Sequence, residues 1–119
     1  MKVFIISSVR NAPQSLRDKL EDYSRQLDDD GHQVYLPHRD TNSSQPSLEI
    51  VRQNKEAIAA ADEIHVYYNP DSQGSHFELG VAFALNKNIR VIENIDYPEG
   101  KSFARVIDEW QAGGAKGDP

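Results

Sequence analysis

The sequence of 119 residues contains no cysteine. A chain without cysteine has no disulfide framework, no thiol nucleophile and no cysteine-bound zinc. Its four histidines lack the spacing typical of a metal site. The sequence also has neither a P-loop nor a Gly-x-Gly-x-x-Gly motif. We therefore expect no bound metal and no cofactor.

Basic residues are fewer than acidic ones: the sequence has 13 Lys and Arg and 19 Asp and Glu, which gives a net charge of −6. This balance argues against a partner such as a nucleic acid polymer, which requires a basic face. Long apolar runs are missing as well: the longest near the N-terminus spans residues 3–6, too short for a signal peptide or a membrane span. We expect a soluble cytoplasmic protein with one domain over residues 1–111 and a flexible tail over 112–119.

The sequence does contain a regular alternation of two kinds of segment. Short apolar runs predict four strands, at residues 3–6, 34–36, 64–68 and 89–92. Amphipathic or apolar stretches after them predict four helices, at residues 14–30, from 47 to about 61, 77–85 and 103–110. Polar, turn-rich segments at 38–46, 69–74 and 94–100 predict loops.

This alternation predicts the α/β class, a flavodoxin-like or Rossmann-like three-layer sandwich with a parallel sheet of four to five strands in the order 2-1-3-4. Ligands of such sheets bind beyond the carboxyl ends of the strands, where the strand order reverses. The loops at 7–13 and 69–76 should therefore be neighbours in space.

These two loops carry residues that suit an anion. Hydroxyls, a guanidinium and a helix N-terminus together are typical of a phosphate site, and a glycine lets the backbone approach a ligand. The candidates are Ser7, Ser8, Arg10, Ser72 and Gly74. Serine, asparagine and glycine are also common in ordinary turns and caps, so the residues alone leave both interpretations open.

Glu78 stands in the most apolar predicted helix, where a carboxylate is costly unless it is paired or lies at a pocket mouth. Ser75-x-x-Glu78 fits a capping box, in which Glu78 only bonds to the backbone. Alternatively, Glu78 is a nucleophile or base that the helix dipole keeps ionised. Asn54 interrupts the apolar stripe of the second helix and needs a partner, either a backbone group or a ligand in the same cleft.

Three groups of motifs resemble a known family over residues 2–93. They are Ser72-x-Gly74-x-x-x-Glu78-Leu79-Gly80-x-Ala82 followed by Ala84-Leu85-Asn86-Lys87, the segment Phe4-Ile5-Ile6-Ser7-Ser8-Val9-Arg10, and the pair Ala61-Asp62. The family is that of the nucleoside 2-deoxyribosyltransferases, and its branch of 2′-deoxynucleoside 5′-monophosphate N-glycosidases is the more similar part.

The resemblance implies an activity in which Glu78 attacks the anomeric carbon and forms a covalent glycosyl-enzyme, as in retaining glycosidases. Water then resolves the intermediate in the hydrolases, and a second base does so in the transferases. The resemblance also assigns the binding residues: Ser8, Arg10 and Ser72 hold the 5′-phosphate, Ser7 and Gly74 add backbone contacts, and Phe4 lies near the sugar or base.

The resemblance further implies a homodimer with a shared site, in which Ser102 occupies the position of a phosphate-contacting serine from the partner. The sequence departs from the family at Asn54, which stands where the family has the Asp that assists departure of the base. An amide can orient a sugar or base but cannot deliver a proton; an alignment shifted by one turn would bring Glu56 or Glu49 to that role. Hydrolysis of a nucleotide is the function we expect, with nucleotide binding without catalysis, or deoxyribosyl transfer, as alternatives.

Overall fold

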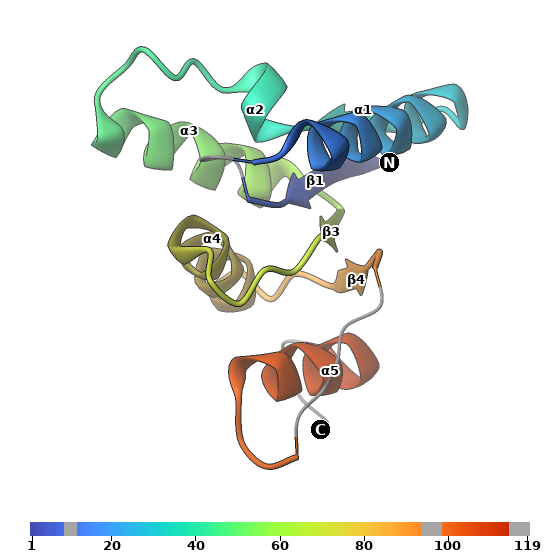
Figure 1. Ribbon diagram of the computed structural model, residues 1–119, viewed down its shortest axis with the longest axis vertical. Coiled ribbons are helices and arrows are strands. Elements are labelled where there is room, and N and C mark those ends of the chain that lie inside the picture. Colours follow the sequence, from blue (N-terminus) through green and yellow to red (C-terminus); the bar gives the residue numbers. More distant parts are fainter. Residues whose placement is uncertain (9–11, 94–98, 115–119) are drawn as a thin grey trace.

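The computed structural model describes residues 1–8, 12–93 and 99–114 (Figure 1). Its elements are β1 (Lys2–Ile6), α1 (Gln14–Asp29), β2 (Gln33–Tyr35), α2 (Pro37–Asp40), α3 (Ser47–Ala60), β3 (Glu63–Val66), α4 (Gln73–Ala84), β4 (Ile89–Val91) and α5 (Phe103–Gly113). None of the helices in these ranges is long and apolar enough to cross a membrane. The predictions for Arg10 and for residues 115–119 of the tail concern residues outside the described ranges.

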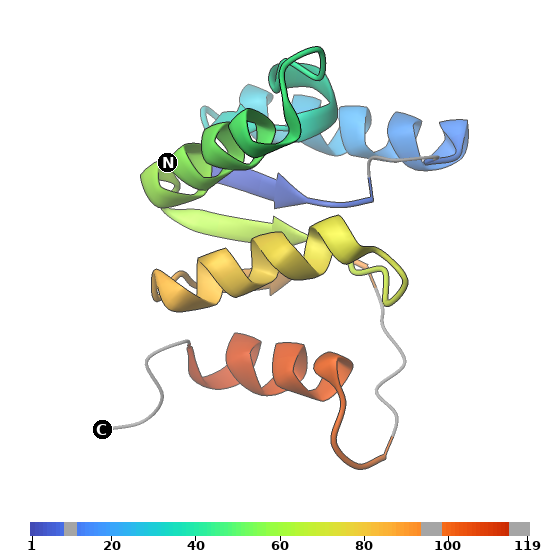
Figure 2. The same cartoon turned by 90° about the vertical axis from the view of Figure 1, so that its left-hand side faces the viewer.

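The four strands form one parallel sheet in the order β2-β1-β3-β4, which confirms the predicted fold class and strand order. Figure 2 shows α3 and α4 in front of the sheet, α1 behind it, and α5 beyond the β4 edge. Alternate residues of β1 point to opposite faces of the sheet, as expected for a strand. Val3 and Ile5 pack with α1, whereas Phe4 and Ile6 pack with α3, α4 and α5.

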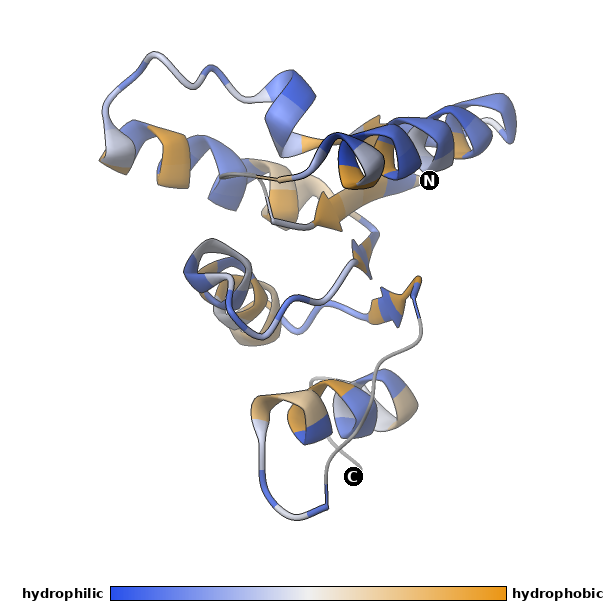
Figure 3. Cartoon of the chain, in the orientation of Figure 1, coloured by the Kyte–Doolittle hydropathy of each residue, from blue (hydrophilic) through white to orange (hydrophobic). Residues whose placement is uncertain are grey.

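The helix α1 illustrates how the sequence pattern fixes a packed face. Leu20 and Leu27 are buried against the sheet, Leu16 and Tyr23 are partly buried beside them, and the rest of the helix is largely hydrophilic (Figure 3). Gly31 adopts a φ of 90° just after the helix end, a conformation that favours glycine. The predicted stripe and its stop signal are both confirmed.

The prediction of a loop from residue 38 was wrong, because Pro37 begins the one-turn helix α2 instead of only ending a strand. Proline suits the first helical position since its missing N–H has no partner there. The carboxylate of Asp40 accepts a hydrogen bond from the Leu36 N–H at 2.9 Å and closes the turn. The other boundaries differ less: β2 lies one residue earlier than predicted, β3 ends at Val66, and α4 begins at Gln73.

The segment after α4 connects three helices. Asn86 adopts a φ of 58°, which ends α4. The Nζ of Lys87 donates to the carbonyl oxygens of Ala59 and Ala61 at 2.8 and 2.7 Å and so satisfies the end of α3. The Nε1 of Trp110, in α5, donates to the Lys87 carbonyl at 2.9 Å. The Asn-Lys pair therefore holds the layer of α3, α4 and α5 together.

A buried polar chain fastens α1 to the other face of the sheet. His65, in β3, is 1% exposed; its Nε2 lies 2.7 Å from Glu63 Oε1 and its Nδ1 lies 2.5 Å from the Tyr23 hydroxyl. Burial lowers the pKa of His65, which favours the neutral ring. A neutral ring that donates from Nε2 to the carboxylate accepts at Nδ1 from Tyr23, so both nitrogens are satisfied.

Replacing Tyr23 by Phe should lower the free energy of unfolding by about 1–3 kcal/mol, because it leaves the buried Nδ1 of His65 without a donor. Urea unfolding at pH 7 measures the change. Tyr67→Phe is the matched control, since Tyr67 is also buried in the cluster against α1 but its hydroxyl bonds to no described residue. Equal stability of the two variants would contradict this role of Tyr23.

Candidate active site

The loops after β1 and β3 meet at the carboxyl edge of the sheet, as the sequence predicts. The Nδ2 of Asn69 donates to the hydroxyl of Ser8 at 2.8 Å, although the two residues are 61 positions apart. The parallel pairing of β1 with β3 is the cause, because parallel strands end at one edge. Ser8, in the first loop, and Ser72, at the end of the second, are thus brought to the same edge.

The start of α4 is capped by Ser72, whose hydroxyl accepts from the Ser75 N–H at 3.2 Å. The capping box of Ser75 with Glu78 is therefore wrong, because Ser75 lies inside the helix and not at its cap. Ser75 is 1% exposed, and its hydroxyl has no hydrogen-bond partner. At Gly74 an added Cβ would meet no atom within 4 Å, so the space beside this turn is open.

Glu78 is the most perturbed group at this edge. The residue is partly buried, but its Oε2 is fully covered and has no hydrogen-bond partner. Burial raises the pKa of Glu78 from 4.5 to about 8. A helix dipole contributes about 0.3–1 kcal/mol, whereas each unit of pKa corresponds to about 1.4 kcal/mol. The expectation that the dipole keeps Glu78 ionised is therefore wrong, because burial outweighs the dipole and favours the protonated form.

Three covered polar atoms without partners lie at this end of the sheet: Ser7 Oγ directly after β1, and Ser75 Oγ and Glu78 Oε2 in the first half of α4. Buried polar groups in folded proteins normally have a partner. Polar atoms without partners at the carboxyl edge of a parallel sheet are expected of a site that a polar ligand completes.

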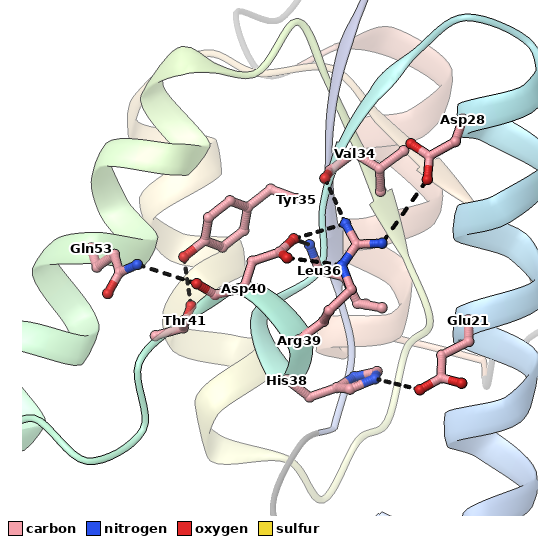
Figure 4. A network of polar contacts seen from close by, with 10 residues as sticks. All are labelled: Glu21, Asp28, Val34, Tyr35, Leu36, His38, Arg39, Asp40, Thr41 and Gln53. Carbon is pink, nitrogen blue, oxygen red and sulfur yellow. Dashed lines mark hydrogen bonds and ion pairs between the residues drawn. The ribbon is translucent and has the colours of Figure 1, made fainter.

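Asn54 is 9% exposed and bonds to a side chain rather than to the backbone. Its Oδ1 accepts from the hydroxyl of Thr41 at 2.6 Å, and that hydroxyl also lies 2.6 Å from the hydroxyl of Tyr35 (Figure 4). Nothing in the sequence pattern indicated Tyr35 or Thr41, because their roles depend on α2, which the periodicity did not predict.

Phe4 lies at the centre of β1 and not at its end, and it is fully buried. Its ring stacks on Tyr35, with ring centroids 5.4 Å apart and planes 8° apart. The ring of Phe4 therefore packs against Tyr35 and has no exposed surface that a ligand could contact.

Ser102 caps α5, since its hydroxyl accepts from the Arg105 N–H at 3.1 Å. The next residue, Phe103, contacts the ring of His76 with centroids 5.3 Å apart, so α4 and α5 begin side by side. Sequence reasoning considered His76 only as a metal ligand. Its ring bonds to the Tyr68 hydroxyl at 3.0 Å and to the Ser72 carbonyl at 2.7 Å, which ties the cap of α4 to the end of β3.

The sequence model of the nucleoside 2-deoxyribosyltransferase family matches residues 10–108. Among solved structures, the CMP N-glycosidase BcmB of Clostridium botulinum is similar with a TM-score of 0.65 and 20% identity, over 92% of this chain and 81% of its own. The 2-deoxyribosyltransferase of Bacillus psychrosaccharolyticus is similar with a TM-score of 0.66 and 19% identity, over 91% of each chain. The 2-deoxyribosyltransferase of Leishmania mexicana is similar with a TM-score of 0.64 and 20% identity, over 82% of this chain and 67% of its own. At such identities these structures show a shared fold, and no curated protein matches the sequence.

Replacing Glu78 by Gln should stabilise the protein more at high pH than at low pH. Below pH 4.5 the raised pKa costs no stability. Between pH 4.5 and about 8 the free energy of unfolding falls, because Glu78 is ionised in the unfolded chain while burial keeps it protonated in the folded protein. We expect the variant to be more stable than the wild type by several kcal/mol at pH 8.5 and similar to it at pH 4.5, since a rise in pKa from 4.5 to about 8 corresponds to at most about 5 kcal/mol. Urea unfolding at both pH values measures this, with Glu56→Gln on exposed α3 surface as the control; a gap that does not change with pH would refute the assignment.

Proposed function

Since the chain belongs to the nucleoside 2-deoxyribosyltransferase family, which is a family of enzymes, we propose that it hydrolyses the N-glycosidic bond of a nucleoside 5′-monophosphate or of its deoxy form. The observation that carries the proposal is Glu78: a covered carboxyl oxygen without a partner, in a helix that begins at the ligand-binding edge of the sheet. Family and fold together support N-glycosidase or deoxyribosyltransferase activity, and the choice of hydrolysis of a nucleotide is ours.

In the proposed reaction the ionised Glu78 attacks C1′ of the sugar. The C1′–N bond breaks, its electron pair leaves with the base, and a covalent glycosyl-Glu78 ester remains. A water molecule then attacks C1′ and releases the carboxylate and the sugar phosphate. With a pKa of about 8, about a tenth of Glu78 is ionised at pH 7. The rate should therefore rise with pH until Glu78 is ionised.

The serine hydroxyls at the carboxyl edge support a phosphate-binding role. Ser7 Oγ has no partner, and the hydroxyls of Ser8 and Ser72 accept one hydrogen bond each, so each retains a proton to donate to an anion. Gly74 leaves space for close approach. We assign the 5′-phosphate to these residues and to Arg10, which lies outside the described residues.

Transfer of deoxyribose between bases is the second candidate function, because the family model is that of the transferases and a transferase has the same fold. Both reactions use the same nucleophile and differ in what resolves the intermediate. A transferase exchanges bases on a free nucleoside, whereas the proposed hydrolase releases base from a nucleotide without an acceptor.

Incubation of the protein with a panel of nucleosides and nucleoside 5′-monophosphates should release a free base from a nucleotide, detected by liquid chromatography. Glu78→Gln should lower kcat by at least about 1,000-fold, because the covalent intermediate cannot form. In the wild type kcat/KM should rise with pH up to about 8, the pKa of Glu78. Release of base at the wild-type rate by the variant would exclude Glu78 as the nucleophile, and nucleotide binding without any release by the wild type would favour the binding-only alternative.

We also propose a homodimer, because apolar side chains are exposed on two adjacent helices. They are Phe77 and Phe83 on α4, with Leu85 just after it, and Phe103 and Val106 on α5. Phe103 is 71% exposed beside the start of α4. A second copy that covers this surface would approach Ser102, which adjoins Phe103, so the partner's start of α5 could lie near the nucleotide.

Size-exclusion chromatography with light scattering should give about twice the chain mass of 13.4 kDa. Phe103→Ser should shift the protein to the monomer and weaken its activity by about tenfold or more, because burial of an aromatic side chain contributes strongly to association. Lys19→Ser, on the opposite layer, is the control. A wild-type mass of 13.4 kDa at all concentrations would contradict the homodimer.

A further inference from the structure

The short helix α2 fixes the position of Thr41, the residue that follows it. Both oxygens of Asp40 bind the guanidinium of Arg39, at 2.8 and 2.9 Å, and one also accepts from the Leu36 N–H. Arg39 in turn donates to the Val34 carbonyl at 2.9 Å (Figure 4). This network ties α2 to β2, so that Thr41 leaves the helix at a defined place.

The hydroxyl of Thr41 lies between the Tyr35 hydroxyl and the Asn54 side chain, and it donates to one of them and accepts from the other. It donates its only proton to Asn54 Oδ1 at 2.6 Å, and it must therefore accept from the Tyr35 hydroxyl, also at 2.6 Å. In the reverse direction the Tyr35 proton would have no acceptor among the described residues. Tyr35 itself is held by its stack on Phe4.

The chain of hydroxyls therefore orients the amide of Asn54. With Oδ1 turned toward Thr41, Nδ2 points the other way, and it makes no hydrogen bond to a described residue. Asn54 is 9% exposed, and Nδ2 is the atom of its amide that no described residue binds. An amide that is locked on one side and open on the other is prepared to donate to a ligand.

Asn54 and Glu78 lie at similar depths on one face of the sheet. The helices α3 and α4 pack side by side in front of the sheet, and both begin at its carboxyl edge (Figure 2). At 1.5 Å per residue, Asn54 lies about 10 Å and Glu78 about 8 Å along their helices from that edge. Asn54 and Glu78 are therefore carried by two helices that pack against each other on the same face of the sheet.

We propose that Tyr35 and Thr41 position the Asn54 amide so that Nδ2 donates to the departing base, and that this selects bases with a carbonyl oxygen next to the glycosidic nitrogen, that is, pyrimidines. The inference rests on the proposed function. Breaking the C1′–N bond sends its electron pair into the base, and in a pyrimidine that charge spreads onto the adjacent oxygen. The amide stabilises this oxygen without giving up a proton, and the base then takes its proton from water. A purine departs most readily after protonation of its ring, which an amide cannot provide.

Binding is tested in the Glu78→Gln background, which should not turn over, by calorimetry with uridine and adenosine 5′-monophosphates. We expect the uridine nucleotide to bind at least about tenfold more tightly, which is the effect of one well-placed hydrogen bond. Thr41→Val and Tyr35→Phe should remove this preference while leaving adenosine nucleotide binding unchanged, and Thr41→Ser should retain it. Tyr67→Phe, on the far face of the sheet, is the control and should change neither affinity.

Equal affinity for the two nucleotides, or a preference that survives Thr41→Val, would overturn the inference. Turnover gives the second measurement: Asn54→Asp supplies an acid, so purine release should increase and its rate should fall at high pH as the new carboxyl ionises. An unchanged ratio of purine to pyrimidine release would also count against the role of the amide. Absence of base release from every nucleotide, together with a uridine preference that depends on Thr41, would refute hydrolysis and retain the selectivity of Asn54.

Discussion

The parallel pairing of β1 with β3 is the constraint on which the candidate site depends. The two strands run side by side from Val3 opposite Glu63 to Ile6 opposite Val66, so both strands end at the same edge of the sheet. Their loops are then joined by the hydrogen bond between Asn69 and Ser8. Because α3 and α4 also begin at this edge, it gathers serine hydroxyls, the first turns of two helices and a carboxyl group.

Three buried polar groups of this protein differ in how completely their hydrogen bonds are satisfied. His65 has a partner on each nitrogen, Tyr23 and Glu63, which satisfies its buried ring and fastens α1 to the sheet. Glu78 has a covered oxygen with no partner, and Asn54 is bonded on one side only. Unsatisfied groups lower stability, and proteins tolerate such departures from local consistency mainly at functional sites.

The capping of α4 explains why Glu78 is placed where it costs stability. Ser72 satisfies the helix start, so Ser75 and Glu78 lie one turn deeper than a capping box would place them. The carboxyl group therefore accepts no hydrogen bond from a backbone amide, and burial favours its protonated form. Such a group is a stronger base once it ionises, and its burial lowers the free energy of unfolding at high pH.

The alternation of strands and helices, the strand order, the packed face of α1 and the meeting of the two loops can all be predicted from the amino-acid sequence. Each follows from local hydrophobic periodicity and from the handedness of parallel connections. The sequence also singled out Glu78 and Asn54 as polar residues in apolar stripes. The lack of a partner for Glu78, and the contact of Asn54 with Thr41 and through it with Tyr35, emerge only from the folded structure. Hydrogen-bond partners are often distant in the chain, and they come within reach only when the strands have paired and the helices have packed.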